Sequence, residues 1–405
     1  MGKFMSRLTV ADGGGSKPSP LGSVAGWRSC KLGDLIDEGV AELQTGPFGT
    51  MLSSSEYRSE GTPVIAVQDI GNNKLRHEKF VYVSDSTASR LAKYRVQEGD
   101  IIFGRKGAVE RRARIAKDES GWLQGSDCIR LRFIGSTVDS EFMSFQFGGG
   151  AHKEWMMQNS TGATMPSLNQ DVLRLLPVIL PPPSEQKAIA ISLASLDHKI
   201  DLLSRQNWTL DSMAETLFRQ WFVESAGEEW IEYPLSGIAT FLNGLACQKY
   251  PPANELDKLP VLKIRELSSG VSETSDWATS RVKPEYIVEA GDVIFAWSAS
   301  LMVKLWGGEK CVLNQHLFKV TSDEFPKWFY LMWCKHHLAE FIAISSSHAT
   351  TMGHIKRGDL DAAMVLVPPS SVLETMSKQM TPLLDKQIEI AKQRKTLEKL
   401  RDTLL

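Results

Sequence analysis

Residues 96–103 read VQEGDIIF, and residues 288–295 read VEAGDVIF. In both stretches a Gly-Asp pair, which favours a turn, stands directly before a short run of β-branched residues that ends in phenylalanine. A turn signal followed by such a run predicts a buried β-strand. The same turn and strand are therefore predicted twice, and a repeat of this kind indicates a duplicated domain.

The neighbouring sequence repeats in the same order around these two stretches. Each copy opens on a tryptophan and a short segment centred on glycine, continues with a strand-like stretch that contains proline, and closes on a double proline. In the first copy these are Trp27, KLGDL at 31–35, TPVI at 62–65 and VILPP at 178–182; in the second they are Trp230, PLSGI at 234–238, LPVL at 259–262 and VLVPP at 365–369. The spacing between matched segments falls along the chain, so the second copy is the shorter one.

The segments inside each copy predict an α+β fold. Alternating stretches such as IRLRF at 129–133 predict half-buried strands, separated by clusters of Gly, Pro, Asn and Ser. The amphipathic segments 140–146 and 328–344 predict helices. We therefore expect two pseudo-symmetric, mixed α/β domains at residues 26–180 and 226–367.

A polar sequence with a heptad of apolar residues follows each double proline. From Ser184 the spacing predicts a coiled-coil seam, formed by Ile189, Leu193, Leu196, Ile200, Leu203, Asn207, Leu210, Ala214, Leu217 and Trp221. From Ser370 the same spacing continues with three polar occupants, at Leu373, Met376, Met380, Leu383, Gln387, Ile390, Arg394, Leu397, Arg401 and Leu404.

These two heptad segments predict long helices at 181–225 and 368–405. A heptad by itself can equally indicate a dimer. Because each seam follows one copy of a duplicated domain, we expect an intramolecular antiparallel coiled coil that separates the two domains. Pro382 interrupts the second helix, either as a kink or as a first helical residue capped by Thr381.

Composition indicates a soluble globular protein of more than one domain. Its 405 residues are 42% hydrophobic and 23% charged, and no apolar run approaches the roughly 18 residues that cross a bilayer. A net charge of -2 leaves any nucleic-acid binding to local basic clusters. Five scattered cysteines without a CxxC pair fit a reducing cytoplasm. Residues 1–25 are expected to form a flexible leader, because glycine, serine and proline punctuate them.

Five further segments read LQTGPFG at 43–49, EGDII at 98–102, PPPSEQ at 181–186, LFRQWF at 217–222 and LNQHLF at 313–318. Together they resemble the recurring signatures of the specificity subunits of type I restriction-modification enzymes. The segments at 181–186 and 217–222, at the two ends of the first long helix, are the most specific of the five. The resemblance covers residues 26–405.

This resemblance implies two target recognition domains, each of which reads one half of a split, asymmetric site in double-stranded DNA. The long helices would act as a ruler and dock methylation subunits, two per chain, and restriction subunits would join through the complex. S-adenosylmethionine, ATP and Mg would bind those partners, so this chain would hold no cofactor. We therefore expect a non-catalytic, cytoplasmic subunit that binds no membrane.

A basic segment in the first copy supports DNA contact from the residues themselves. Directly after a predicted strand, six cations stand against the single acid Glu110: Arg105, Lys106, Arg111, Arg112, Arg114 and Lys117. A cationic hairpin suits phosphate and major-groove contact, although a charge run can also be a solvated surface. The second copy is far less basic at the equivalent place, with Trp297, Ser298, Ser300 and Lys304. Two half-sites of different sequence require such a difference.

Other candidate base readers are polar side chains that flank predicted strands. They are Gln44, Thr45, Gln68, Gln124 and Ser126 in the first copy, and Asn243, Lys263, Arg265, Asn314, Gln315 and His316 in the second. For each of them a structural hydrogen bond is at least as good an interpretation.

Large aromatic residues on the first long helix are candidate anchors for partner subunits. They are Trp208, Phe218, Trp221 and Phe222. A two-helix rod buries only one face of each helix, so aromatics elsewhere on it are costly to expose without a partner. Trp221 also lies on the seam and is equally well explained as core.

The sequence lacks recognisable catalytic motifs. It has no Asn/Asp-Pro-Pro-Tyr/Phe block for amino methylation, no glycine-rich nucleotide fingerprint and no GxxxxGK[ST] loop. Asp171 with Glu185 and Lys187 mimics a nuclease triad, but Glu185 follows three prolines and is better explained as a helix start. No standard metal-site spacing is met by Cys311, His316, Cys334, His336 and His337. Two alternatives stay open: a stand-alone DNA-modifying enzyme with unrecognised motifs, and a coiled-coil scaffold that binds no DNA.

Overall fold

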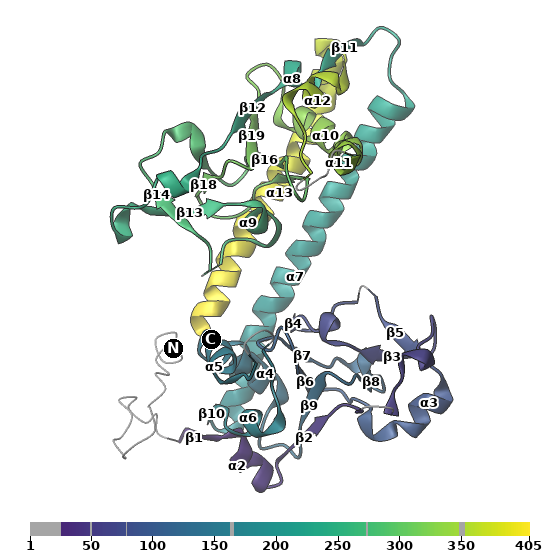
Figure 1. The fold of residues 1–405 in the computed structure, drawn as a ribbon, viewed down its shortest axis with the longest axis vertical. Coiled ribbons are helices and arrows are strands. Elements are labelled where there is room, and N and C mark those ends of the chain that lie inside the picture. The colour runs from purple at the N-terminus through teal and green to yellow at the C-terminus, as the bar shows by residue number, and fades with distance from the viewer. Residues whose placement is uncertain (1–25, 49–50, 78, 163–165, 273, 348–352) are drawn as a thin grey trace. The chain divides into compact units, whose positions relative to one another are not determined.

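The structure is a computed structural model that describes the chain apart from residues 1–25, 49–50, 78, 163–165, 273 and 348–352. The expected leader therefore lies outside the described residues. The chain divides into two compact units. Unit 1 comprises Met1–His198 together with Glu398–Leu405, and unit 2 comprises Lys199–Leu397. Figure 1 labels their helices and strands.

Unit 1 is built on two sheets and a strand pair. The larger sheet has the order β2-β9-β6-β7-β4, with β2 at Ala41–Thr45, β9 at Cys128–Phe133, β6 at Ile101–Gly104, β7 at Arg112–Arg114 and β4 at Asn72–Asn73. The smaller sheet has the order β5-β3-β8, with β5 at Val81–Val83, β3 at Thr62–Ile65 and β8 at Leu123–Gln124. The strand pair joins β1 at Arg28–Lys31 to β10 at Pro177–Leu180. The strand predicted at 129–133 is confirmed within β9.

Short helices pack against the sheets of unit 1, with α3 beside the smaller sheet. They are α2 at Leu32–Asp37, α3 at Asp85–Arg90, α4 at Ser140–Gly148, α5 at Gly150–Asn159 and α6 at Gln170–Arg174. The helix predicted at 140–146 is confirmed as α4, whose first turn is capped by the Asp139 carboxylate, an acceptor for the Phe142 N–H at 2.8 Å. Phe142 and Phe147 of α4 pack on Phe103 and Ile129 of the sheet.

Unit 2 repeats this arrangement. One sheet has the order β12-β19-β16-β17, with β12 at Thr240–Asn243, β19 at Leu317–Thr321, β16 at Val293–Ala296 and β17 at Met302–Leu305. The other has the order β14-β13-β18-β15, with β14 at Trp277–Thr279, β13 at Lys258–Leu262, β18 at Cys311–Leu313 and β15 at Ile287–Val288. The strand pair joins β11 at Ile231–Pro234 to β20 at Met364–Val367.

The helices of unit 2 are α8 at Leu235–Ile238, α9 at Ile264–Ser269, α10 at Lys327–His336, α11 at Leu338–Ser347 and α12 at Arg357–Ala362. The single helix predicted at 328–344 is wrong, because α10 ends before His337 and α11 begins after it. His337 donates from its ring Nε2 to the Met364 carbonyl at 2.9 Å, which ties the break to β20.

Strand register confirms the duplication residue by residue. Gly104 of β6 lies opposite Cys128 of β9 in unit 1, and Ala296 of β16 lies opposite Leu317 of β19 in unit 2. The sheets β5-β3-β8 and β14-β13-β18-β15 each contain one parallel pair among the described strands, and these pairs match, since β3 pairs with β8 and β13 pairs with β18. The two copies predicted from the repeat therefore have one topology.

The repeated Gly-Asp pair has a structural role. Gly99 and Gly291 adopt φ values of +86° and +100°, which favour glycine. The aspartate that follows closes the turn, because Asp100 accepts from the Gln97 N–H at 2.7 Å and Asp292 accepts from the Glu289 N–H at 2.8 Å. The motif therefore turns the chain into β6 and into β16.

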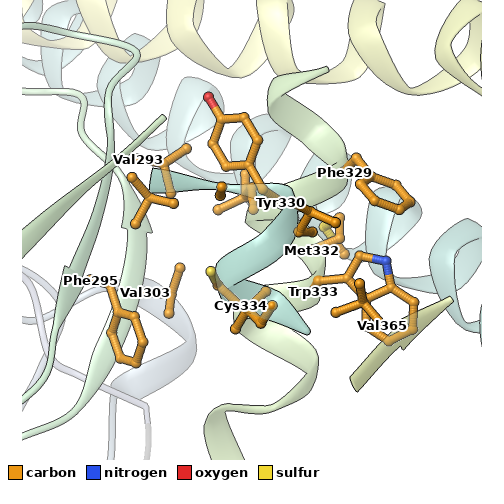
Figure 2. Packing of buried hydrophobic residues seen from close by; sticks show 14 of the residues in the cluster. Val293, Phe295, Val303, Phe329, Tyr330, Met332, Trp333, Cys334 and Val365 are labelled. Carbon is orange, nitrogen blue, oxygen red and sulfur yellow. The ribbon is translucent and has the colours of Figure 1, made fainter. Parts of the chain in front are cut away.

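A large apolar cluster lies between the sheet and the helices of unit 2. Figure 2 shows Val293, Phe295 and Val303 of the sheet on one side of it, and Trp333 and Val365 on the other. Phe295 and Phe329 are fully buried. Burial of each such ring contributes on the order of 2–3 kcal/mol, so this cluster stabilises unit 2.

The two long helices predicted from the heptads are confirmed as α7 at Pro183–Arg219, which continues as a π-helical turn over Gln220–Glu224, and α13 at Ser370–Leu404. Every predicted seam position of α7 is buried or half-buried. In unit 1 the start of α7 meets the end of α13, where Arg401 donates to Asp197 at 2.9 Å. In unit 2 Phe218 near the end of α7 packs with Met376 and Met380 near the start of α13. The helices are therefore antiparallel.

Pro382 lies inside α13 and starts no new helix. The proline removes one main-chain donor, which leaves the Lys378 carbonyl without its helical partner. Both residues are exposed, so water can satisfy that carbonyl. Of the two interpretations of Pro382, the capped start is therefore wrong.

Candidate nucleic-acid interface

Three strand ends meet at one edge of the larger sheet of unit 1. β2 ends at Thr45, β6 ends at Gly104, and the start of β9 lies opposite both. Residues that flank these ends are therefore neighbours although they are far apart in the sequence. We name this set strand-end site 1: Thr45, Phe48, Arg105, Lys106, Ser126 and Asp127.

Main-chain hydrogen bonds hold strand-end site 1. The Arg105 N–H donates to the Asp127 carbonyl at 2.7 Å, and the Arg105 carbonyl accepts from the Leu168 N–H at 2.8 Å. The Gly46 N–H donates to the Cys128 carbonyl at 3.0 Å. A Cβ on Gly46 would stand 1.9 Å from the Gly125 carbonyl oxygen, so this approach requires glycine.

The side chains of strand-end site 1 are cationic and polar. The Arg105 guanidinium lies over the Phe48 ring, 4.9 Å from its centroid, and the Lys106 ammonium lies 3.3 Å from the Asp127 carboxylate. Thr45 accepts from the Gln170 amide at 2.8 Å. Ser126 is half-buried beside Asp127.

Unit 2 carries the same frame at the matching strand ends. The Trp297 N–H donates to the His316 carbonyl at 3.4 Å, and the Trp297 carbonyl accepts from the Ile355 N–H at 3.1 Å. A Cβ on Gly244 would stand 2.3 Å from the Asn314 carbonyl oxygen. We name the set strand-end site 2: Asn243, Trp297, Ser298, Gln315, His316 and His354.

The side chains of strand-end site 2 are aromatic and neutral polar. The Trp297 indole N–H donates to the Asn243 amide oxygen at 3.1 Å, and its ring stacks on Phe318 at 5.6 Å. The Ser298 hydroxyl pairs with His316 Nδ1 at 3.1 Å. Gln315 and His354 flank the same rings, since the Gln315 amide lies 3.4 Å from His316 Nε2 and the His354 ring lies 6.3 Å from that of Trp297.

The predicted basic hairpin is only partly available to DNA. Arg112 is wrong as a contact, because it is buried beneath α4, where its Nε donates to the Ser144 carbonyl at 2.5 Å. Burial lowers the pKa of Arg112 to about 10. Arg111 lies 3.8 Å from the Glu110 carboxylate, and Arg114 donates to the Ser140 hydroxyl at 3.3 Å. Both are half-buried.

Three other predicted base readers support the frame instead. Gln124 is buried and donates to the carbonyls of Gln44 at 2.6 Å and Cys128 at 2.9 Å. Asn314 is buried and accepts from the His316 N–H at 3.3 Å. Ser298 is buried beneath His316. These predictions are wrong as direct contacts, because side chains that are at most 3% exposed cannot reach a base edge. The Gln44 amide, half-buried, donates to the Thr45 carbonyl at 2.8 Å.

The remaining predicted residues lie away from the strand ends. Gln68 and Arg265 are exposed at equivalent places, three residues after β3 and β13. Arg265 donates to Glu266 at 2.7 Å, and Lys263 pairs with Asp276. Lys304 donates to the Ser268 carbonyl at 3.1 Å, and burial lowers its pKa. Ser300 is exposed.

The predicted aromatic anchors divide into two kinds. Phe218 and Phe222 are wrong as docking residues, because both are buried in unit 2, with their rings stacked 4.9 Å apart and packed on Trp333. Trp221 is half-buried against the same cluster. Trp208 is 73% exposed on α7 and is the candidate that stays accessible.

Sequence reasoning missed three members of the strand-end sites. Phe48 was visible inside a segment used for the resemblance, but its position under Arg105 depends on the folded loop. Asp127 and His354 carried no motif; only strand pairing brings Asp127 to Lys106, and only a bridge between His354 and Ser298 brings His354 to the second site.

The described residues show neither a metal-like cluster nor a membrane helix. No group of three His, Cys, Asp or Glu side chains within that part of the chain is arranged to hold a metal ion. In the same part, no helix is both long and apolar enough to cross a membrane. Glu185 of the nuclease-like pattern accepts from the Trp27 indole N–H at 3.1 Å, near the start of α7.

Comparisons with known proteins agree with the duplicated fold. The chain matches the family described as type I restriction modification DNA specificity domain over residues 26–211 and again over 227–399. It is 25% identical over 382 residues to the type I restriction enzyme MjaIX specificity subunit of Methanocaldococcus jannaschii, covering 86% of this chain and 86% of that protein. The type I restriction enzyme EcoBI specificity subunit of Escherichia coli is 24% identical over 162 residues, which cover 40% of this chain and 33% of that protein.

A solved structure also shares the fold. The S subunit of a type I restriction-modification system from M. genitalium is similar with a TM-score of 0.54 and 13% sequence identity. The similarity covers 95% of this chain and 96% of that one.

Proposed function

The chain belongs to the type I restriction-modification DNA specificity family, and on that basis we propose that it is a non-catalytic subunit that gives such a complex its DNA sequence specificity. One observation carries the proposal: the two strand-end sites share a main-chain frame and present different side chains. Site 1 reads one half of a bipartite, asymmetric double-stranded DNA site, and site 2 reads the other half. Two half-sites of different sequence need different donors and acceptors on a common scaffold.

The charge of each site suits this division. With a net charge of -2 the chain cannot attract DNA as a polycation. Site 1 supplies local cations in Arg105 and Lys106, whereas site 2 supplies amide, imidazole and indole groups. We infer that phosphate attraction is concentrated in unit 1 and that unit 2 depends more on base edges.

The long helices are the proposed docking surface for methylation subunits, two per chain. Trp208 supports this, because it is 73% exposed on α7 and aromatic residues are enriched at protein interfaces. Restriction subunits join through the complex. S-adenosylmethionine, ATP and Mg belong on these partners, where the methylation and cleavage chemistry takes place.

Transfer of a labelled methyl group to DNA tests the proposal. The chain assembled with its methylation subunits should methylate a bipartite site, and the purified chain alone should transfer nothing. Methyl transfer by the chain alone would support a stand-alone enzyme. Absence of a sequence-specific gel shift with the partner subunits present would support a scaffold that does not read DNA.

Lengthening the helices tests their role as a ruler. An insertion of seven residues in both α7 and α13 preserves the heptad and adds about 10 Å to the pair. At roughly 3.4 Å per base pair, mapped methylation sites should gain about three base pairs of spacer, with lower affinity because the grooves rotate. Retention of the original spacer at full activity would contradict this role.

A further inference from the structure

We propose that Arg105 is a specificity-determining residue that takes a guanine in the half-site read by unit 1, and that unit 2 has no counterpart to this contact. The inference rests on the proposed function, because it assumes that strand-end site 1 faces DNA. It adds the residue and the class of base, neither of which follows from the family.

The main chain fixes where the Arg105 side chain starts. Hydrogen bonds hold the residue from both sides, through its N–H to Asp127 and through its carbonyl to Leu168. These partners belong to different segments of unit 1, so the Cα cannot shift without breaking the strand-end frame. A side chain that discriminates between bases needs such a fixed origin.

The Phe48 ring then restricts the orientation of the Arg105 guanidinium. The two groups lie 4.9 Å apart, and Phe48 is 52% exposed, so the platform faces the solvent side of the site. A cation over an aromatic ring is favoured by the ring quadrupole, and stacking keeps the planar fork in one orientation. Arg105 thus presents its donors in a defined direction.

The donors of Arg105 are also uncommitted. Among the described residues, none accepts a hydrogen bond from its guanidinium or forms an ion pair with it. The other arginines of this hairpin are engaged: Arg111 with Glu110, Arg112 with Ser144 and Arg114 with Ser140. The Arg105 guanidinium is therefore oriented but has no acceptor among the described residues. A ligand with two acceptors can supply them.

Guanine is the base that suits this fork. Its O6 and N7 atoms present two acceptors in the major groove that arginine takes with two parallel hydrogen bonds. A phosphate can also accept two hydrogen bonds from a guanidinium, but that contact is the same for every DNA sequence. The Arg105→Ala variant below separates the two, because only a guanine contact makes the lost affinity depend on the base.

Unit 2 differs at the equivalent residue. Trp297 occupies the same place in the frame, but its single indole donor is used by Asn243. No fork is present there, so this position does not take a guanine in the second half-site.

The test uses the chain assembled with its methylation subunits. Methylation mapping first gives the bipartite site, and the half whose recognition survives Trp297→Ala is assigned to unit 1. Each guanine of that half is then replaced by 7-deazaguanine, which keeps base pairing but removes N7. One replacement should weaken binding about 10-fold or more in the parent protein. Arg105→Ala should abolish that difference and relax the sequence preference at the same base pair.

Two controls accompany this variant. Arg111→Ala makes the same chemical change in the same hairpin at a paired arginine and should leave the preference unchanged. Discrimination in the second half-site, measured on the Arg105→Ala complex itself, should also be unchanged, which shows that the variant is folded and assembled.

Three results would overturn the inference. One is a unit 1 half-site without guanine, and another is full discrimination by Arg105→Ala. The third is an Arg105→Ala variant that loses affinity equally for all duplexes, which would make Arg105 a phosphate contact. Failure of the proposed function is distinguishable, because the unmodified complex would then show no site-specific methylation at all.

Discussion

Strand-end site 1 and strand-end site 2 use the same main-chain hydrogen bonds to hold different side chains. Arg105 and Trp297 occupy one equivalent place, and Thr45 and Asn243 occupy another. Arg105, Thr45 and Asn243 lie at strand ends outside the apolar clusters, whereas the Trp297 ring also packs against the main cluster of unit 2 through Phe318. The comparison shows how one fold can present two chemically different surfaces.

A pair of interacting side chains within each site leads to the same conclusion. Lys106 pairs with Asp127 through charge in unit 1, and Ser298 pairs with His316 through a hydrogen bond in unit 2. The places are equivalent, because Arg105 and Trp297 precede the first members and bond through their N–H groups to the second. A contact between the two loops is thus kept while its chemistry differs.

The largest expected effect tests how differently α7 contributes to the cores of the two units. Unit 1 takes small residues such as Ala190 into its core, whereas unit 2 takes the aromatic Phe218 and Phe222. Phe222→Ala should lower the free energy of unfolding by about 3–5 kcal/mol, because a buried ring is lost from a packed cluster. Urea denaturation measures this change.

Trp208→Ala is the matched control on the same helix. This exposed residue should change the free energy of unfolding by no more than about 0.5 kcal/mol, while weakening assembly with partner subunits. A loss below about 1 kcal/mol in Phe222→Ala would show that this aromatic packing contributes little to the stability of unit 2.

Alanine at Gly46 or at Gly244 tests whether the frame is truly shared. Each added Cβ would stand within 2.3 Å of a carbonyl oxygen, so each variant should lose up to about 3 kcal/mol of stability. Methylation-site mapping should show relaxed preference in one half-site only, and in opposite halves for the two variants. Equal relaxation of both halves by one variant would refute independent sites.

Acid pH should lower the stability of unit 1, because His152 is buried there. The ring is buried, its Nε2 donates to the Pro177 carbonyl at 2.8 Å, and burial lowers its pKa to about 4. The unfolded chain, with an ordinary histidine pKa near 6.5, therefore binds the proton first as pH falls. Between pH 7 and pH 5 the folded chain should lose roughly 2 kcal/mol from this group.

His152→Gln, which keeps a donor for Pro177, should remove that part of the pH dependence. The measurement is urea denaturation of both proteins at pH 7 and pH 5. Equal losses of stability in the two proteins would show that the pKa of His152 does not differ between the folded and the unfolded chain.

The smallest expected effect sharpens the difference in charge between the sites. Lys106→Ala should reduce the slope of log affinity against log salt by about 0.9, if Lys106 contacts one phosphate. Ser298→Ala, at the equivalent place, should leave the slope unchanged because it removes no charge. Binding titrations with the mapped duplex at several salt concentrations measure both. Equal slopes in the two variants would remove Lys106 from the interface.

Some predicted site residues lie where the local sequence placed them, and their contact with DNA stays a prediction. Arg105 and Lys106 were identified by charge directly after a strand, and both lie at the strand ends. Arg112 had the same charge but alternates to the other face of β7, where α4 covers it. Nothing in the sequence near Arg112 indicated that α4 would cover this residue. The charge pattern alone therefore predicted that Arg112 lies on the surface.

The amino-acid sequence by itself determined the duplication, the α+β class, the long heptad helices and the family, since each depends on local order or periodicity along the chain. Only the tertiary structure decided which candidates meet: Phe48 under Arg105, Asp127 beside Lys106, and Phe218 inside a core. These contacts join residues far apart in sequence, and strand register and helix packing create them. Local patterns contain no information on such distances, because the free energy that fixes them comes from burial and pairing between segments.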